Sequence, residues 1–452
     1  MLEIILIIIF AIIGTGLGVL TGLIPGLHVN NIAVIMLSLS PALLAALMFL
    51  NGYGIPELFI PMLLVMTIVA MSIAHTFLDF IPSTFLGAPE DETALSVLPA
   101  HSMLLEGRGY EAVMLSAIGS LGGVITAFIF LIPFRFIIGE PGNGYVFLKQ
   151  YMVFILIGIC ILLLFSEQTK IPYKRIINSG QVRYEKGVYS RTLGVTIGII
   201  IFLISGVFGY LILDLELSSP FGLPTTPLFP ALSGLFGLAT LFVSIRGTSG
   251  IPAQQITRPE LPKKETMKSI ATGSIAGSTV GFLPGLSSGV ATVVAMIFRK
   301  EPERKQVIIT LSAINTTNAF FVLVALFLIL RPRSGAAIVV NQLIPVEQWS
   351  GTLMPMPLIY LILGGLVAAV LGFGLTLFIG KKFAKVFTKF PYRKIVITII
   401  IFIIVMVFMF TGVLGLFILA ISTCIGLLPP FFGVRRSHGM GVLLVPVIIM
   451  LW

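Results

Sequence analysis

Long apolar runs recur along the whole chain and constrain its fold more than any other feature. A helix needs about 20 mostly apolar residues to cross a bilayer, and runs of that length are separated here by short polar loops. The clear runs are 57–80, 111–133, 146–165, 193–213, 227–245, 306–330, 354–380 and 395–420, with a last apolar segment at 439–452. Two further apolar segments, 4–48 and 270–298, are interrupted by Pro-Gly. The sequence therefore predicts an all-α polytopic membrane protein with about 10–12 membrane elements.

Composition excludes the main soluble alternatives. Only 10% of the 452 residues are charged, against about 25% in a typical soluble domain. The net charge of +10 resides in short loops between apolar runs, which is a topology signal and not a footprint for nucleic acid. Cys160 and Cys424 both lie in apolar runs and are too few for a disulfide framework or a zinc site. We therefore expect neither a nucleic-acid partner nor a bound metal.

Basic loops predict the orientation in the membrane. The loops richest in Lys and Arg, which we assign to the cytoplasm, are 166–192, 246–269 and 381–394. Loop 214–226 has two acidic residues and no basic one, so it is assigned outside. This assignment predicts a multi-pass protein of the plasma membrane with an extracytoplasmic N-terminus. It also places loop 331–353 outside, although Arg331 and Arg333 disfavour that side.

A glycine pattern occurs twice and ends each time in Pro-Gly-Leu. One copy, GTGLGVLTGLIPGLHVNNIAV, starts at Gly14, and the other, GSIAGSTVGFLPGLSSGVATV, starts at Gly273. At a constant offset, Gly14, Gly18, Gly22, Pro25, Gly26 and Leu27 match Gly273, Gly277, Gly281, Pro284, Gly285 and Leu286. Chance alignment of apolar helices would give scattered Leu and Ile matches, so we interpret the pattern as an internal duplication.

The number of spans between the copies predicts that they are inverted. Five full spans separate the hairpin 4–48 from the hairpin 270–298, and an odd number turns the second copy upside down. We divide the chain into a first repeat, 1–250, a cytoplasmic linker, 246–269, and a second, inverted repeat, 265–452. Inverted repeats with broken helices that meet near the membrane midplane are typical of secondary transporters.

Each Pro-Gly tip is predicted to form part of a site. Proline removes a backbone donor and glycine permits a chain reversal, and broken backbone is tolerated at membrane depth only within protein or beside a cavity. A half-helix is expected after each tip, with Asn30, Asn31, Ser287 and Ser288 as capping residues. The free N–H groups at such an N-terminus suit an anion. The alternative is a pair of glycine kinks in ordinary helices.

Polar residues within the spans complete the predicted site. His28 suits anion binding or proton transfer, and equally a hydrogen-bonded packing role. The cluster 315–318 is predicted to line a cavity, because polar residues facing lipid are costly. The predicted substrate-binding residues are Pro25, Gly26, His28, Asn30, Asn31, Pro284, Gly285, Ser287, Ser288, Asn315, Thr316 and Asn318.

His75 and Asp79 are the candidates for ion coupling. They lie one helical turn apart at the end of run 57–80, and ionisable residues at membrane depth are functional candidates. The alternative is that they lie at the membrane interface. We expect no cofactor other than a coupling cation, Na⁺ or H⁺.

Enzymatic functions find little support in the sequence. It contains no P-loop, no His-Glu-x-x-His and no nucleophile elbow, so neither an ATP motor nor a familiar hydrolase is indicated. An intramembrane enzyme would use His28 or His75 with Asp79, but these groups lie in separate predicted elements. We predict that the protein is not an enzyme.

Three stretches resemble the large permease subunit of the tripartite tricarboxylate transporter (TctA) family. GVLTGLIPGLHVNN and GSTVGFLPGLSSG are similar to its two Gly-rich stretches ending in Leu-Pro-Gly, and GRGYEAVMLSAIGSLGG (107–123) is similar to its Gly-rich helix. The resemblance implies cation- or proton-coupled uptake of carboxylates, with a small membrane subunit and an extracytoplasmic binding protein as partners. It also implies that the Pro-Gly pairs at 25–26 and 284–285 are substrate hairpins. Asn30 and Asn31 stand where the family usually has small residues.

Two transport functions follow. The leading hypothesis is an ion- or proton-coupled secondary transporter for a small organic anion such as a di- or tricarboxylate, with elevator-type alternating access around the two tips and a homodimeric assembly in membrane lipid. The alternative rests on PGLSSG (284–289), which is similar to the Pro-Gly-x-Ser-Gly-Gly signature of polyprenyl-phosphate translocases. A flippase of that kind would hold a lipid phosphate at the same helix N-termini.

Overall fold

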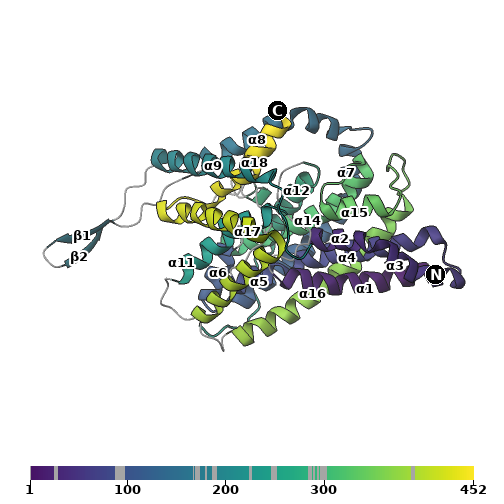
Figure 1. Ribbon diagram of the computed structural model, residues 1–452, viewed down its shortest axis with the longest axis horizontal. Helices are drawn as coiled ribbons and strands as arrows, with labels where there is room; N and C mark the ends of the chain where they lie inside the picture. The colour runs from purple at the N-terminus through teal and green to yellow at the C-terminus, as the bar shows by residue number, and fades with distance from the viewer. Residues whose placement is uncertain are drawn as a thin grey trace.

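The structure is a computed structural model and is helical almost throughout, which confirms the predicted polytopic all-α class. It describes residues 2–24, 29–86, 97–165, 167, 174–178, 181–185, 191–222, 226–245, 252–283, 288, 291–292, 295, 303–387 and 392–452. The strands of the described part are β1 (Lys174–Asn178) and β2 (Gln181–Glu185), an antiparallel hairpin that projects away from the helices (Figure 1).

The helices of the first half of the chain are α1 (Leu2–Leu23), α2 (Val29–Ser38), α3 (Ser40–Leu47), α4 (Ile60–Leu78), α5 (Phe80–Phe85), α6 (Val97–Leu105), α7 (Gly109–Ile138), α8 (Gly144–Phe165), α9 (Arg191–Leu213), α10 (Leu228–Leu232), the π-helical η3 (Ser233–Leu238) and α11 (Ala239–Ile245). Those of the second half are α12 (Lys263–Val280), α14 (Arg304–Ile329), α15 (Gly335–Leu343), α16 (Met356–Phe387), α17 (Tyr392–Phe432) and α18 (Gly441–Leu451). Short 3₁₀ turns are Met48–Tyr53, Glu57–Phe59 and Arg436–Met440.

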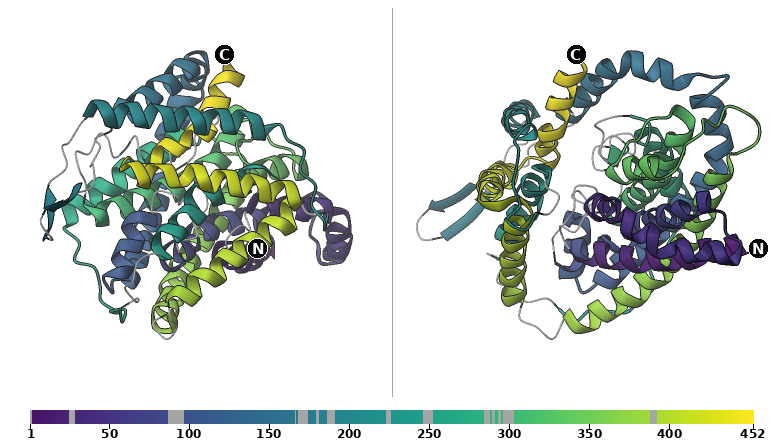
Figure 2. Two further views of the ribbon diagram at one scale, coloured as in Figure 1. Left: turned by 60° about the vertical axis from the view of Figure 1, so that its left-hand side comes forward. Right: turned by 45° about the vertical axis from the view of Figure 1, so that its right-hand side comes forward.

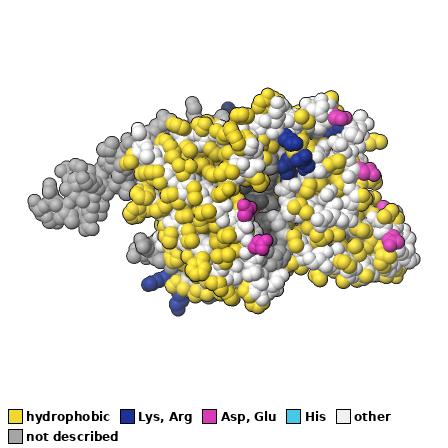
Figure 3. Space-filling view, turned by 45° about the horizontal axis from the view of Figure 1, so that its top comes forward, with side chains coloured by type: hydrophobic (Ala, Val, Ile, Leu, Met, Phe, Trp, Pro, Cys, Tyr) yellow, Lys and Arg dark blue, Asp and Glu magenta, His cyan; other side chains and the backbone are white. Residues whose placement is uncertain are grey.

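The predicted membrane spans are present as helices. Eight helices of the described part are long and apolar enough to cross a membrane, and a bent pair, Ile32–Ser38 with Ser40–Tyr53, gives a ninth element. Two shorter apolar helices, Leu228–Val243 and Arg436–Leu451, bring the count into the predicted range. Many large apolar side chains are exposed, and Figure 3 shows a largely hydrophobic face with few charged groups. Such a surface suits lipid.

The helices form two bodies. In the core body, α1, α7, α12 and α16 surround α4 and α14, and α2 and α15 pack at one end. In the outer body, α8, α9, α10, η3, α11, α17 and α18 pack on one another around their own apolar clusters. The right-hand view of Figure 2 shows the purple N-terminal helices and the yellow C-terminal helices on opposite sides. Each half of the sequence contributes to both bodies, and the predicted repeat boundaries stay a prediction.

The two glycine patterns, Gly14/Gly18/Gly22 in α1 and Gly273/Gly277/Gly281 in and after α12, are called the glycine ladders here, and they make matched contacts in the core body. A Cβ on Gly14 would lie 2.3 Å from the Thr67 carbonyl oxygen, and one on Gly273 would lie 2.5 Å from the Thr310 carbonyl oxygen. The next rungs behave alike: Gly18 abuts Met71 and Ala74, Gly277 abuts Ile314 and Thr317, Gly22 abuts Leu78 and Gly281 abuts Phe321. The residues of α14 contacted by the second ladder are separated from the matching residues of α4, contacted by the first ladder, by one constant number of positions in the sequence. Only glycine lets the backbones approach this closely.

Both interruptions predicted from Pro-Gly are present. Helix α1 ends at Leu23 and α2 begins at Val29, while α12 ends at Val280 and is followed by a turn at Gly281 and Phe282. The tip residues Pro25, Gly26, His28, Pro284, Gly285 and Ser287 lie outside the described residues.

Two polar segments predicted as loops contain structure. Segment 166–192 contains the β-hairpin and segment 331–353 contains α15. These elements are five to nine residues long, so none of them carries the 20-residue apolar signal on which the span prediction depends.

The ladder contacts predict a position-dependent effect of added side chains. We expect Gly18→Val to destabilise the protein by about 1–3 kcal/mol, because its Cβ would lie 2.7 Å from Ala74 Cβ. Gly16→Val is the matched control, since Gly16 lies on the same helix with nothing within 4 Å of an added Cβ. The thermal unfolding midpoint in detergent measures both. Equal midpoints for the two variants would contradict the ladder packing.

Candidate functional site

A small polar cavity lies where α2, α4, α14 and α15 meet. Its volume is about 60 Å³, which corresponds to several water molecules at roughly 10–15 Å³ each. Its polar lining consists of Asn30, Ser72, His75, Thr76, Asn318 and Ser334. Its apolar lining consists of Val29, Ala319, Val322, Leu323 and Ala336. The polar groups are hydroxyls, amides and one imidazole, a set that can donate hydrogen bonds to an anion.

Two helix N-termini reach this cavity. Helix α2 begins at Val29, and α15 begins at Gly335 after its N-cap, Ser334. The Ala336 N–H donates to Asn30 Oδ1 at 3.0 Å and the Ala337 N–H donates to Ser334 Oγ at 3.1 Å. Asn30, a residue of α2, therefore caps α15. The positive ends of two helix dipoles still converge on the cavity, and this field favours a negative charge.

The polar residues of α4 and α14 meet directly. The Thr76 hydroxyl donates to Thr316 Oγ1 at 3.1 Å, and Asn315 Nδ2 donates to Asp79 Oδ2 at 2.9 Å. From the first contact to the second, the residue number on α4 rises from 76 to 79 while that on α14 falls from 316 to 315. The two helices therefore cross in antiparallel directions. All four residues are at most 3% exposed. The cluster beginning at Asn315 therefore faces protein, as lipid exposure would be costly.

Further hydrogen bonds extend this buried polar contact. His75 Nδ1 lies 3.1 Å from Thr21 Oγ1 of α1, and Asn318 Nδ2 donates to Ser288 Oγ at 3.4 Å. Ser312 Oγ donates to Ser116 Oγ of α7 at 2.8 Å. Helices α1 and α7 and residue Ser288 thus add partners to the polar residues of α4 and α14, and we call this set of hydrogen-bonded side chains the polar seam. It consists of Thr21, His75, Thr76, Asp79, Ser116, Ser288, Ser312, Asn315, Thr316 and Asn318.

The structure brings some of the sequence-predicted residues together. Asn30, His75 and Asn318 line the cavity, whereas Thr316, Asn315, Ser288 and Asp79 lie in the polar seam beside it. Asn31 belongs to α2, but its side chain lies outside the described residues. The tip residues named above are outside them as well.

Sequence reasoning missed Ser334, Ser72 and Thr21. Ser334 carries a readable signal, since it precedes the apolar helix GAAIVVNQL as an N-cap residue should. Ser72 and Thr21 are single small polar residues in apolar helices, and nothing in their spacing marks them as cavity or seam residues.

Among the described residues, no group of three or more His, Cys, Asp or Glu side chains could hold a metal ion. The groups that the structure describes at the site are hydrogen-bond donors, the N-termini of α2 and α15, and the ionisable residues His75 and Asp79.

The chain matches the Tripartite tricarboxylate transporter TctA family over residues 8–441. The chain belongs to the TctA family. An uncharacterized protein of Methanocaldococcus jannaschii is 30% identical over 331 residues, which are 73% of this chain and 71% of that relative. No solved structure matches the chain. Membership of this family implies that the protein acts as a transporter permease, which agrees with its membrane-spanning helices.

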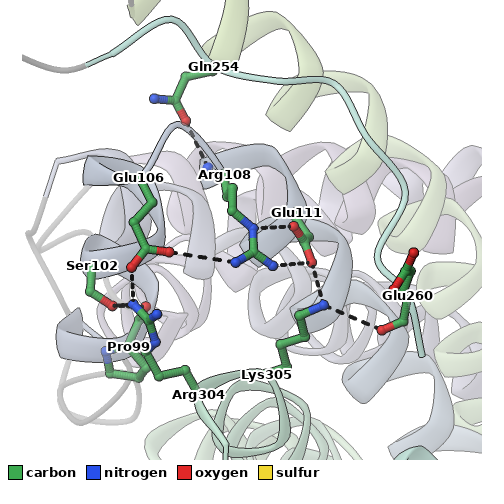
Figure 4. A network of polar contacts seen from close by, with 10 residues as sticks. Pro99, Ser102, Glu106, Arg108, Glu111, Gln254, Glu260, Arg304 and Lys305 are labelled. Atoms are coloured by element: carbon green, nitrogen blue, oxygen red, sulfur yellow. Dashed lines mark hydrogen bonds and ion pairs between the residues drawn. The ribbon is translucent and has the colours of Figure 1, made fainter. Parts of the chain in front are cut away.

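A charged network lies at the start of α7 in this TctA-family protein (Figure 4). Glu111 is buried and accepts hydrogen bonds from Arg108 at 2.7 and 2.9 Å, and Lys305 Nζ lies 3.0 Å from Glu111 Oε1. These hydrogen bonds raise the pKa of the Arg108 guanidinium. Glu106 joins the network through Arg108, whose Nη1 lies 3.6 Å from Glu106 Oε2, and Glu106 also pairs with Arg304 at 2.6 Å. The network ties α6 and α7 of the first half to α14 of the second.

The segment between the two halves is fixed to the same place. Gln254 Oε1 accepts from the Gly109 N–H at 2.8 Å, its Nε2 donates to the Leu104 carbonyl, and the Gln255 N–H donates to the Gly107 carbonyl. Within the predicted linker 246–269, residues 252–262 thus form an ordered strap over the α6–α7 turn, and residues 263–269 already belong to α12.

The network predicts unequal effects of two similar substitutions. Glu111→Gln should lower stability by about 1–3 kcal/mol, because a buried carboxylate that serves two cations is lost. Glu106→Gln is the control and should change stability by at most about 1 kcal/mol, since its side chain is 42% exposed. Thermal unfolding in detergent measures both changes. A larger loss of stability in Glu106→Gln than in Glu111→Gln would contradict the conclusion that Glu111 is the more important carboxylate of the network.

Proposed function

We propose that the protein is the permease of a secondary transport system that carries a small organic anion, such as a di- or tricarboxylate. The observation that carries this proposal is the polar cavity at the N-termini of α2 and α15, lined by Asn30, His75, Asn318 and Ser334. Helix N-termini and neutral donors favour a carboxylate without leaving a fixed cation in the site.

Transport proceeds by alternating access around the two Pro-Gly tips, in an elevator-type movement of the core body against the outer body. The matched glycine ladders support the two repeats, since α1 packs on α4 as α12 packs on α14. The antiparallel crossing of α4 and α14 supports their inversion. Two inverted hairpins at one site provide equivalent barriers on opposite sides of the membrane.

The transported anion is coupled to Na⁺ or H⁺ through His75 and Asp79. His75 lines the cavity and Asp79 lies one turn away, 2% exposed, with Asn315 as a hydrogen-bond donor. A carboxylate at this depth is costly unless a proton or a cation accompanies it. If the ion binds at Asp79, the charge state of the Asp79 carboxylate affects binding of the transported anion, and the bound anion affects ion binding in turn.

The remaining proposals follow the family. We place the protein in the plasma membrane, with an extracytoplasmic N-terminus, and we propose that it works as a homodimer with a small membrane subunit and an extracytoplasmic binding protein.

The cavity supports the carboxylate hypothesis over the flippase. Its volume of about 60 Å³ and its polar lining suit a small hydrophilic group, whereas the apolar groove that could hold a long polyprenyl chain lies apart from it, between α11 and α17 of the outer body.

Uptake by proteoliposomes tests the site. We expect Asn318→Ala to raise KM for a transported carboxylate roughly tenfold, because a hydrogen-bond donor is lost from the cavity. Asn341→Ala is the control, since it makes the same chemical change on the exposed side of α15. Unchanged transport in Asn318→Ala would remove the cavity from the mechanism.

A second variant tests coupling. Asp79→Asn keeps the shape of the side chain but can neither bind a proton nor balance a cation. We expect loss of accumulation driven by a pH or Na⁺ gradient, while exchange of labelled substrate persists. Asp214→Asn, at an exposed site beyond α9, should accumulate substrate normally. Full gradient-driven accumulation by Asp79→Asn would exclude this residue from coupling.

A further inference from the structure

Two arginines lie directly before the cavity in the chain. Helix α14 ends at Ile329, Leu330 adopts a left-handed conformation with φ 51°, and Arg331 to Arg333 lead into Ser334. Ser334 and Ala336 line the cavity. The segment between α14 and α15 thus carries two positively charged residues, at one and three positions before the lining residue Ser334.

Arg333 is held in place by an aromatic side chain. Its Nη2 donates to the Tyr145 hydroxyl at 2.6 Å, and its guanidinium carbon lies 5.4 Å from the centre of the Tyr145 ring. Tyr145 belongs to the first turn of α8. A stacked and hydrogen-bonded guanidinium is pre-organised, so it loses little conformational freedom when it meets a ligand.

The positive charge of this segment is not neutralised by the described part of the protein. Within that part, no carboxylate lies within 4.0 Å of a side-chain nitrogen of Arg331 or Arg333. Burial lowers the pKa of Arg333, and the nearby charge of Arg331 acts in the same direction. Two neighbouring like charges are unfavourable until an anion approaches them.

Topology makes the same residues unexpected. The loop orientation that follows from the other basic segments places 331–353 outside the cell, where Lys and Arg are normally depleted. Two arginines in a loop assigned to the outside are explained if transport requires positive charge at this position.

Size connects the arginines to the choice of substrate. A cavity of about 60 Å³ has room for several groups of the size of a water molecule, which is fewer than the atoms of a tricarboxylate. An anion with two or three carboxylates must therefore extend beyond it, and the next charged groups along the lining segment are Arg333 and Arg331.

We propose that Arg331 and Arg333 form a cationic mouth to the cavity and select anions that carry two or more carboxylates. This inference rests on the proposed function, since the cavity holds one carboxylate and the arginines bind the others. Guanidinium groups suit this role because their planar donors match carboxylate geometry.

The test compares carboxylates of different charge in proteoliposomes. We expect Arg333→Gln to raise KM for a tricarboxylate such as citrate about tenfold. KM for a monocarboxylate such as acetate, where wild type transports it, should change less than about twofold. Arg331→Gln should shift the same ratio in the same direction. Arg333→Lys should recover part of the preference, and raising the ionic strength should reduce it in wild type.

Two controls separate charge from structure. Tyr145→Phe removes the hydroxyl partner of Arg333 but keeps both the ring and the charge, so the preference for citrate should remain. Lys149→Gln removes a positive charge one turn further along α8, on an exposed side chain, and should leave the KM ratio unchanged.

The outcomes distinguish this inference from the function on which it rests. If wild type transports citrate and the two Arg→Gln variants retain its KM, the cationic mouth is wrong and the transport function stands. If Arg333→Gln unfolds, binding of citrate to detergent-solubilised Arg331→Gln and Arg333→Lys decides instead, and wild-type affinity in both would overturn the inference. If wild type neither transports nor binds any carboxylate, the proposed function itself is wrong.

Discussion

Close contact between glycine-lined helices and two buried helices organises this protein. Helices in a membrane gain little from the hydrophobic effect when they associate, so they depend on close packing and on hydrogen bonds. The ladder of α1 brings its backbone against α4, and the ladder of α12 does the same on α14. The last glycines, Gly22 and Gly281, abut the backbone of His75 and Val322, and both of these residues line the cavity. The packing that holds each broken helix thus also places its broken end beside the site.

Hydrogen bonds between α4 and α14 then allow these two buried helices to carry polar side chains inside the otherwise apolar core body. These helices are the most buried spans of the described part, so a polar side chain on either one must find a protein partner or water. The Thr76–Thr316 and Asn315–Asp79 hydrogen bonds meet this need across the antiparallel crossing for the hydroxyls and for the Asn315 amide nitrogen, while Asn315 Oδ1 has no hydrogen-bond partner in the described part. The cavity lies where that pairing stops, between His75 and Asn318.

The spans and the helix breaks were predictable because both leave local signals. Apolar length identifies a span, and Pro-Gly after a glycine ladder identifies an interruption. The burial of the Asn315 cluster was predictable from the cost of exposing polar groups to lipid. The partner of Asn30 was not, because its contact with Ala336 joins residues 306 positions apart and no periodicity encodes it. The helix α15 was missed for a related reason: nine residues are too few for a span signal.

The most direct test of the account is an experimental structure of the protein with a bound di- or tricarboxylate. The account predicts ligand density in the cavity between α2, α4, α14 and α15, with one carboxylate beside Asn318 and Ser334. Ligand density elsewhere, for example in the apolar groove lined by Phe242 of α11 and Leu416 of α17, with the cavity occupied only by water, would contradict it.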